Sequence, residues 1–251
     1  MRVWVLLLAL LVTLPARSEI IRLTNGEWPP YFGEHLPHHG VGSRIVEEAF
    51  AREGVEVQWE FHPWARALRM AERGQRTGTA LWLRSPEREG AFHISEAVLE
   101  SGYVLFHRRD RRFDWQSVDD LQGLRLGGTL GYDYGEAFQQ AERDGRLQVA
   151  RMRGERQGLD MLLAGRIDVL PVDRIVALHL LRNEYDVTER ARLTYHPRPL
   201  RVDTLHLLLS RRVSGNAELL ARFNHGLAAL RREGLLDRYL DDLQQTLALA
   251  H

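Results

Sequence analysis

The sequence predicts an α/β protein made of two lobes. Short apolar segments with strand patterning alternate with amphipathic helical segments along the chain. This alternation runs once, is interrupted by an extended and charged stretch at 97–112, and then starts again near Leu124. The 251 residues, 44% of them hydrophobic, are enough to build the cores of two such lobes.

The elements of the first round follow from periodicity and from the residues that end them. Apolar residues at helical spacing predict two helices that end at Gly54 and Gly74, and Pro63 suits the start of the second one. Pro29 and Pro30 enforce an extended path after the first strand. The expected order is strand 20–24, helix 42–53, strand 55–61, helix 64–73, strand 79–83 and extended segment 97–106.

The second round contains a glycine-rich loop, 127–131, between a strand and a helix. Its helices carry apolar residues on one face, and Gly165 ends one of them. Two amphipathic helices, 217–232 and 235–243, close the chain. The expected order before them is strand 124–126, helix 134–143, strand 147–152, helix 156–164, strand 167–172, helix 175–182 and strand 204–210.

The N-terminus has the pattern of a secretory signal peptide. Arg2 precedes an apolar run at 3–14, and the small residues Ala16 and Ser18 follow. As a helix this run would span about 18 Å, which is short of a bilayer core of about 30 Å. A short buried helix is the alternative. We expect cleavage near Ser18, release into the periplasm and no stable insertion into a membrane, because no later stretch is long and apolar enough to cross one.

The composition excludes several kinds of chemistry. All 34 basic residues are arginine, so no lysine can form a Schiff base. The absence of cysteine excludes disulfides, thiol nucleophiles and cysteine-ligated zinc. The G-x-S-x-G, H-E-x-x-H, G-x-x-x-x-G-K-[ST] and G-x-G-x-x-G signatures are also missing. We therefore expect no cofactor and no catalytic residue.

Two charged or metal-binding patterns each have a simpler structural explanation. His35, His38 and His39 are metal-ligating residue types, but Pro37 and the nearby glycine favour a solvated loop over a metal site. The arginine-rich run at 108–112 favours a solvated strand end over a nucleic-acid surface, because the chain as a whole carries no excess of positive charge.

Aromatic residues near the ends of predicted strands are candidates for a ligand-binding wall. Trp28, Tyr31, Trp64 and Trp82 lie close to turns, and ligands of open α/β sheets bind at strand ends. Burial in a core is the alternative for all four. The 127–131 loop likewise either offers backbone N–H groups to an anion or is a plain tight turn.

Five segments carry a family resemblance: the aromatic-proline loop 28–31, the Glu-Arg motif 85–88 with 92–95, the connector 118–125, the segment 164–173 and the ending 234–239. In this order they resemble the type II extracytoplasmic solute-binding proteins, in particular the polar amino-acid-binding branch (bacterial extracellular solute-binding protein family 3). The resemblance covers about 20–243, nearly all of the chain after the predicted signal peptide. It implies the periplasmic-binding-protein type II fold, in which two α/β lobes are joined by two hinge strands.

The resemblance also implies how a ligand is held. In such proteins the arginine of the Glu-Arg motif, here Arg88, binds a carboxylate through two parallel charged hydrogen bonds. The acid that ends the last strand of the second lobe, here Asp173, binds an ammonium group. Ligand would then stabilise a closed state by bending hinges near 104–107 and 203–206.

Some residues depart from the pattern of the family. Relatives carry serine or threonine before the Glu-Arg motif, whereas this chain has the apolar segment 80–83 with Trp82 and Leu83. After the glycine loop with Thr129, Tyr132 and Asp133 stand where relatives often have a small threonine. These changes favour a large or aromatic side chain on the ligand, and Trp64 with Arg66 adds a second candidate anion contact.

The predicted organisation is a signal peptide at 1–18, a first lobe at 19–105 and 206–251, and a second lobe at 106–205. The predicted function is to capture a small amino-acid-like zwitterion or carboxylate, as a monomer, for an ABC permease or a sensor receptor. The alternative is an exported enzyme resembling the cyclohexadienyl dehydratases, with Asp173, Asp133 or Glu27 as its general acid. A signalling module would need a separate receptor.

Overall fold

The computed structural model describes residues 19–248, so the predicted signal peptide lies outside the described residues. Eight strands form one sheet in the order β2-β1-β3-β8-β4-β7-β5-β6. The strands are β1 (Glu19–Asn25), β2 (Val55–Phe61), β3 (Gly78–Leu83), β4 (Phe92–Arg108), β5 (Arg125–Thr129), β6 (Gln148–Met152), β7 (Val169–Asp173) and β8 (Leu193–Ser210).

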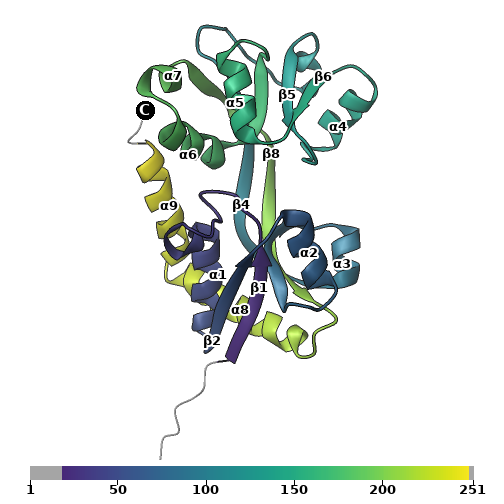
Figure 1. Cartoon of the computed structure of the whole chain (residues 1–251), viewed down its shortest axis with the longest axis vertical. Helices are drawn as coiled ribbons and strands as arrows, with labels where there is room; N and C mark the ends of the chain where they lie inside the picture. The colour runs from purple at the N-terminus through teal and green to yellow at the C-terminus, as the bar shows by residue number, and fades with distance from the viewer. Residues whose placement is uncertain (1–18, 249–251) are drawn as a thin grey trace, which may run out of the picture.

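Two long antiparallel strands, β4 and β8, run through both lobes (Figure 1). They pair with each other from the Phe92–Ser210 position to the Arg108–Leu193 position. In the first lobe β8 also pairs with β3, and in the second lobe β4 also pairs with β7. The two α/β lobes predicted from the sequence are thus joined by two shared strands, which confirms the predicted fold class.

The directions of the strands bring the carboxyl ends of both parallel sets face to face. In the first lobe β3 runs parallel to β1 and antiparallel to β8, so these strands point toward the second lobe. In the second lobe β7 runs antiparallel to β4 and parallel to β5, so they point back toward the first. Ligands of open α/β sheets bind outside carboxyl ends, and here two such edges oppose each other.

The helices cover the sheet of each lobe. The first lobe carries α1 (Val41–Ala51), α2 (Trp64–Glu72), α3 (Pro86–Ala91), α8 (Asn216–Arg232) and α9 (Leu235–Ala248), and the second carries α4 (Glu136–Arg143), α5 (Glu155–Leu163), α6 (Arg174–Glu184) and α7 (Val187–Ala191). Short 3-10 helices lie at Pro37–His39 and Val118–Leu121. Within residues 19–248, no helix is sufficiently long and apolar to span a bilayer.

The core is built from the apolar faces that the periodicity predicted. Phe50 of α1 and Phe223 of α8 are fully buried, with their ring centroids 4.9 Å apart. The two helices approach so closely that a Cβ at Gly226 would lie 2.0 Å from the carbonyl oxygen of Ala49. A second cluster around Tyr134 and Phe138 fills the space between α4 and the sheet of the second lobe.

Several elements differ from the sequence-based expectation. Helices α3 and α7 were not predicted, although Asp186 and Glu189 form a capping box at the start of α7. Strand β8 begins at Leu193, well before the expected 204, because its first half pairs with β4. Pairing of β4 with β7 begins at Tyr103, a few residues before the predicted boundary at 105/106, and the lobe limits stay a prediction.

Candidate functional site

On the edge of the first lobe, Trp82 is placed by an irregularity in β3. The pairing of β3 with β8 shifts register between Thr79 and Trp82, and Leu81 has a left-handed backbone with φ of 56°. Such a conformation costs a bulky residue about 1–3 kcal/mol unless its surroundings fix it, and Leu81 is buried. The bend lets the Trp82 indole Nε1 donate to the Thr79 hydroxyl at 2.9 Å.

Two indoles and a guanidinium form one cluster on this edge, which we call the Trp82–Arg88 cluster. The rings of Trp64 and Trp82 meet edge to face with centroids 5.2 Å apart. The guanidinium carbon of Arg88 lies 4.9 Å from the centroid of the Trp82 ring. Leu83, the last residue of β3, belongs to the same cluster, because its backbone oxygen accepts a hydrogen bond from Arg88 Nη1 at 2.5 Å. The structure therefore brings together four of the predicted residues.

Arg88 is a half-buried cation without an acidic partner. Among residues 19–248, no carboxylate lies within ion-pair distance of its guanidinium, in contrast to the neighbouring Arg84, which pairs with Glu89 at 2.5 Å. Burial lowers the pKa of Arg88, and the charge of Glu87 opposes this shift without outweighing it. An anion that approached the Trp82–Arg88 cluster would thus compensate a charge that the protein leaves uncompensated.

Trp28 and Tyr31 lie in the loop after β1, where their rings are 4.7 Å apart. This loop contains a cis peptide bond between Pro29 and Pro30. The indole nitrogen of Trp28 is buried and has no hydrogen-bond partner among the described residues. Tyr31 is almost fully buried, and its hydroxyl donates to Asp173 Oδ1 at 3.4 Å, which connects the first lobe to the second.

Asp173 does not present a free carboxylate. It is the N-cap of α6, where Oδ1 accepts from the N–H groups of Ile175 at 2.9 Å and Val176 at 3.0 Å. Its Oδ2 accepts from the Ser101 hydroxyl at 2.7 Å. Burial raises the pKa of Asp173 although these hydrogen bonds oppose the shift. Its predicted role in holding an ammonium group stays a prediction, but the carboxylate already has partners inside the protein.

Three predicted residues follow or end β5 in the second lobe. Thr129 is buried, and its backbone N–H donates to the Tyr134 hydroxyl at 2.7 Å. Asp133 pairs with Arg201 at 3.0 Å and also accepts from the N–H of Gly135. Tyr132 is half-buried and donates its hydroxyl to Glu155 Oε1 at 2.8 Å. Of these three, only Tyr132 donates its hydroxyl to an acid that forms no ion pair within the described part of the chain.

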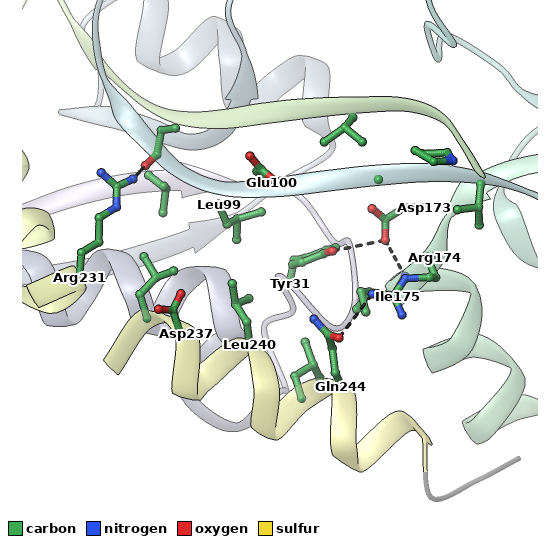
Figure 2. Close-up of a pocket in the computed structure, with 18 of the residues that line it drawn as sticks. Tyr31, Leu99, Glu100, Asp173, Arg174, Ile175, Arg231, Asp237, Leu240 and Gln244 are labelled. Carbon is green, nitrogen blue, oxygen red and sulfur yellow. Dashed lines mark hydrogen bonds between the residues drawn. The ribbon is translucent and has the colours of Figure 1, made fainter. Parts of the chain in front are cut away.

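A cavity of about 530 Å³ lies beside the segments where β4 and β8 pass between the lobes. Figure 2 shows that Tyr31 points toward Asp173 inside it, while α9 forms one wall with Leu240 and Gln244. Tyr31 and Asp173 line this cavity, and the other predicted ligand-binding residues do not. The cavity is thus separate from the Trp82–Arg88 cluster.

The histidine loop gives no sign of a metal centre. Among residues 19–248, no group of three or more metal-ligating side chains is arranged to hold an ion. His39 contacts the backbone oxygen of Glu34 at 3.1 Å through Nδ1, and its ring lies 5.7 Å from that of Phe61.

Two residues of the second-lobe edge were missed by the sequence analysis. Tyr103 of β4 lies 6.4 Å from Tyr132 and 5.5 Å from Tyr134, measured between ring centroids. Glu155 is the first residue of α5 and comes three positions after the end of β6. Its position after a parallel strand is the signal that could have found it, since Tyr132 follows the neighbouring strand β5 in the same way.

Comparison with known proteins supports the family resemblance. No family model matches the chain. The L-cystine-binding protein TcyJ of Escherichia coli is 25% identical over 152 residues, which cover 61% of this chain and 53% of TcyJ. The chain therefore spans about half the length of the curated relative that it matches.

Solved structures confirm the fold. An ancestral arginine-binding protein bound to arginine has a TM-score of 0.70 at 18% identity, covering 89% of this chain and 97% of its own. A histidine kinase sensor domain with similarity to periplasmic binding proteins has a TM-score of 0.71 at 19% identity, covering 90% and 96%. The ancestral amino-acid-binding protein AncCDT-1, a precursor of cyclohexadienyl dehydratase, has 0.67 at 16% identity, covering 89% and 94%. The fold is that of the periplasmic-binding proteins, and the resemblance to type II solute-binding proteins is supported.

Proposed function

We propose that this protein is an exported solute-binding protein that captures a small amino-acid-like ligand between its two lobes. The observation that carries the proposal is the half-buried guanidinium of Arg88, which has no acidic partner among residues 19–248 and lies against Trp82. Arg88 follows β3 at the edge formed by the carboxyl ends of the first-lobe strands, and this edge faces the carboxyl ends of the second-lobe strands. A ligand carboxylate is the group that this cation suits best.

The fold gives the proposal a mechanism of capture. The lobes are joined by the two strands β4 and β8, so a change of backbone angles in these strands alters the distance between the opposed edges (Figure 1). A ligand that contacts both edges stabilises the closed arrangement by its differential affinity for that state. The predicted signal peptide places the protein in the periplasm, where a permease or a sensor receptor would take over the ligand.

The surroundings of the three candidate acids favour binding without catalysis over the dehydratase alternative. Asp173 is fixed as a helix cap, and Asp133 is paired with Arg201. Glu27 accepts from the backbone N–H of Glu34 at 3.0 Å. A general acid must reach the leaving group with its proton available, and these three carboxyl groups have structural partners. Incubation with arogenate and prephenate tests the alternative, since formation of an aromatic product would replace the binding proposal.

A thermal-shift screen with the twenty standard L-amino acids, followed by calorimetric titration, tests the proposal. Arg88→Gln removes the charge, and we expect it to weaken binding of every amino acid that binds by about 10- to 150-fold, the range for hydrogen bonds to charged groups. Arg84→Gln is the matched control, because Arg84 is an exposed arginine paired with Glu89 in the same segment. Equal affinities of the two variants would contradict the proposal, as would the absence of any bound amino acid.

A further inference from the structure

The acids on the edge of the second lobe differ in whether a cation neutralises them. Asp133 and Asp203 both pair with Arg201, at 3.0 Å and 2.6 Å. Asp173 is buried and accepts hydrogen bonds from Tyr31, Ser101 and the first turn of α6. Glu155 is different: its single hydrogen-bond partner among residues 19–248 is the neutral hydroxyl of Tyr132. Of these four acids, Glu155 is thus the one that has neither an arginine partner nor more than one side-chain hydrogen bond among residues 19–248.

The surroundings of Glu155 are aromatic. Tyr132 and Tyr103 meet at an interplanar angle of 83°, which makes a corner of two ring systems next to the carboxylate. Tyr134 stands behind them, with its ring centroid 6.4 Å from that of Tyr132. Burial, and then the charge of Glu155, raises the pKa of the Tyr132 phenol, and burial together with the charge of Asp173 raises that of Tyr103. Both phenols are thus neutral at any physiological pH.

An organic cation is the group that such a corner recognises. A carboxylate accepts charged hydrogen bonds from an ammonium or guanidinium group, and the faces of aromatic rings attract the same charge. Tyr132 fixes the carboxylate by donating to one oxygen, which leaves Oε2 of Glu155 without a hydrogen-bond partner in the described part of the chain. Arg88 on the opposite edge presents the complementary arrangement, a cation against an indole ring.

We propose that Glu155, with the rings of Tyr103 and Tyr132, binds the cationic nitrogen of the ligand while Arg88 binds its carboxylate. The ligand class is therefore an amine-bearing carboxylate, and Glu155 rather than Asp173 decides between it and a simple carboxylate. This inference rests on the proposed function, because it assigns the second half of the same interlobe site. A ligand that carries both charges would also favour closure, because it would contact charges of opposite sign on the two lobes.

The experiment compares each amino acid that binds with the corresponding carboxylate that lacks the amine, such as L-phenylalanine with 3-phenylpropanoate. We expect the wild-type protein to prefer the amine-bearing member by 10-fold or more, and Glu155→Gln to abolish this preference without changing affinity for the deaminated partner. Glu136→Gln is the matched control, because Glu136 is the first residue of α4 as Glu155 is of α5, and it is 85% exposed. This control should keep the full preference.

A second variant separates positioning from charge. Tyr132→Phe removes the hydroxyl that orients Glu155 but keeps the ring and the carboxylate. We expect it to lower the preference for the amine-bearing ligand by a factor of 2 to 10, less than Glu155→Gln does, with unchanged thermal stability of the free protein.

The outcomes distinguish this inference from the proposed function. If Glu155→Gln retains a 10-fold preference for the amine, or if the wild-type protein shows none, the inference is wrong while solute binding stands. Binding of succinate but of no amino acid would contradict both the inference and the amino-acid-like ligand of the proposed function. If neither amino acids nor their deaminated partners bind to the wild-type protein, the proposed function and the inference both fail.

Discussion

Replacement of Asp173 by alanine tests whether this acid has a structural role. The variant removes the N-cap of α6, which costs about 1 kcal/mol, and takes the acceptor from the buried hydroxyls of Ser101 and Tyr31. A buried donor left without a partner costs about 1–3 kcal/mol, and relief of the desolvation of the carboxylate offsets part of this sum. We expect the free energy of unfolding to fall by about 2–4 kcal/mol.

Asp173→Asn is the control, because it removes the charge of the side chain but keeps its shape and its hydrogen-bonding groups. The amide oxygen still accepts from Ile175 and Val176, and the amide nitrogen can donate to the Ser101 hydroxyl, so we expect a loss below about 1 kcal/mol. Urea denaturation followed by circular dichroism measures both variants. If the asparagine variant is as unstable as the alanine variant, or if alanine has no effect, the role as a helix cap is refuted.

The dependence of stability on pH gives a further check on Asp173. Burial raises the pKa of this carboxyl above its ordinary 3.8, so the folded state binds the proton more tightly than the unfolded state does. The stabilisation linked to this proton is complete below about pH 3.8 and is lost as the pH rises through the folded pKa. Compared with Asp173→Asn, the wild-type protein should therefore lose stability as the pH rises within this window. A gain of wild-type stability relative to the variant in the same window would contradict the raised pKa.

Three further predictions follow from other contacts. Gly226→Ala places a Cβ 2.0 Å from the backbone oxygen of Ala49 and should lower the unfolding free energy by about 1–3 kcal/mol or more in urea titrations, whereas Gly90→Ala, with no atom within 4 Å of its Cβ, should leave it nearly unchanged. Trp82→Leu removes the ring that faces Arg88, and calorimetry should show about 2- to 30-fold weaker binding of an amino acid that binds the wild-type protein. Tyr31→Phe breaks a long hydrogen bond of 3.4 Å, so we expect a loss of less than about 1 kcal/mol in denaturation, and a larger loss would indicate a stronger link between the lobes.

The local sequence predicted much of the fold because periodicity and end signals are local properties. Strand β2 and the start of α2 lie where the alternation at 55–61 and Pro63 place them. Trp82 in β3 and Arg88 in α3, both predicted for the site, lie in contact and are only six positions apart in the chain. Short-range patterns of this kind remain visible in a single sequence.

What only the tertiary structure decided depends on contacts between residues far apart in the chain. Ser101 and Tyr31 reach Asp173 across 72 and 142 positions, and these contacts give an acid that was predicted to bind ligand hydrogen-bond partners inside the protein. The pairing of β5 with β6 placed Glu155 beside Tyr132, and the sequence pattern of either strand does not show which strand it pairs with. Sequence by itself determined most of the strands and helices, apart from α3, α7 and the first half of β8, and which ends carry polar and aromatic groups. The tertiary structure decided which charges are compensated, because compensation depends on partners that only the assembled sheet brings within hydrogen-bonding distance.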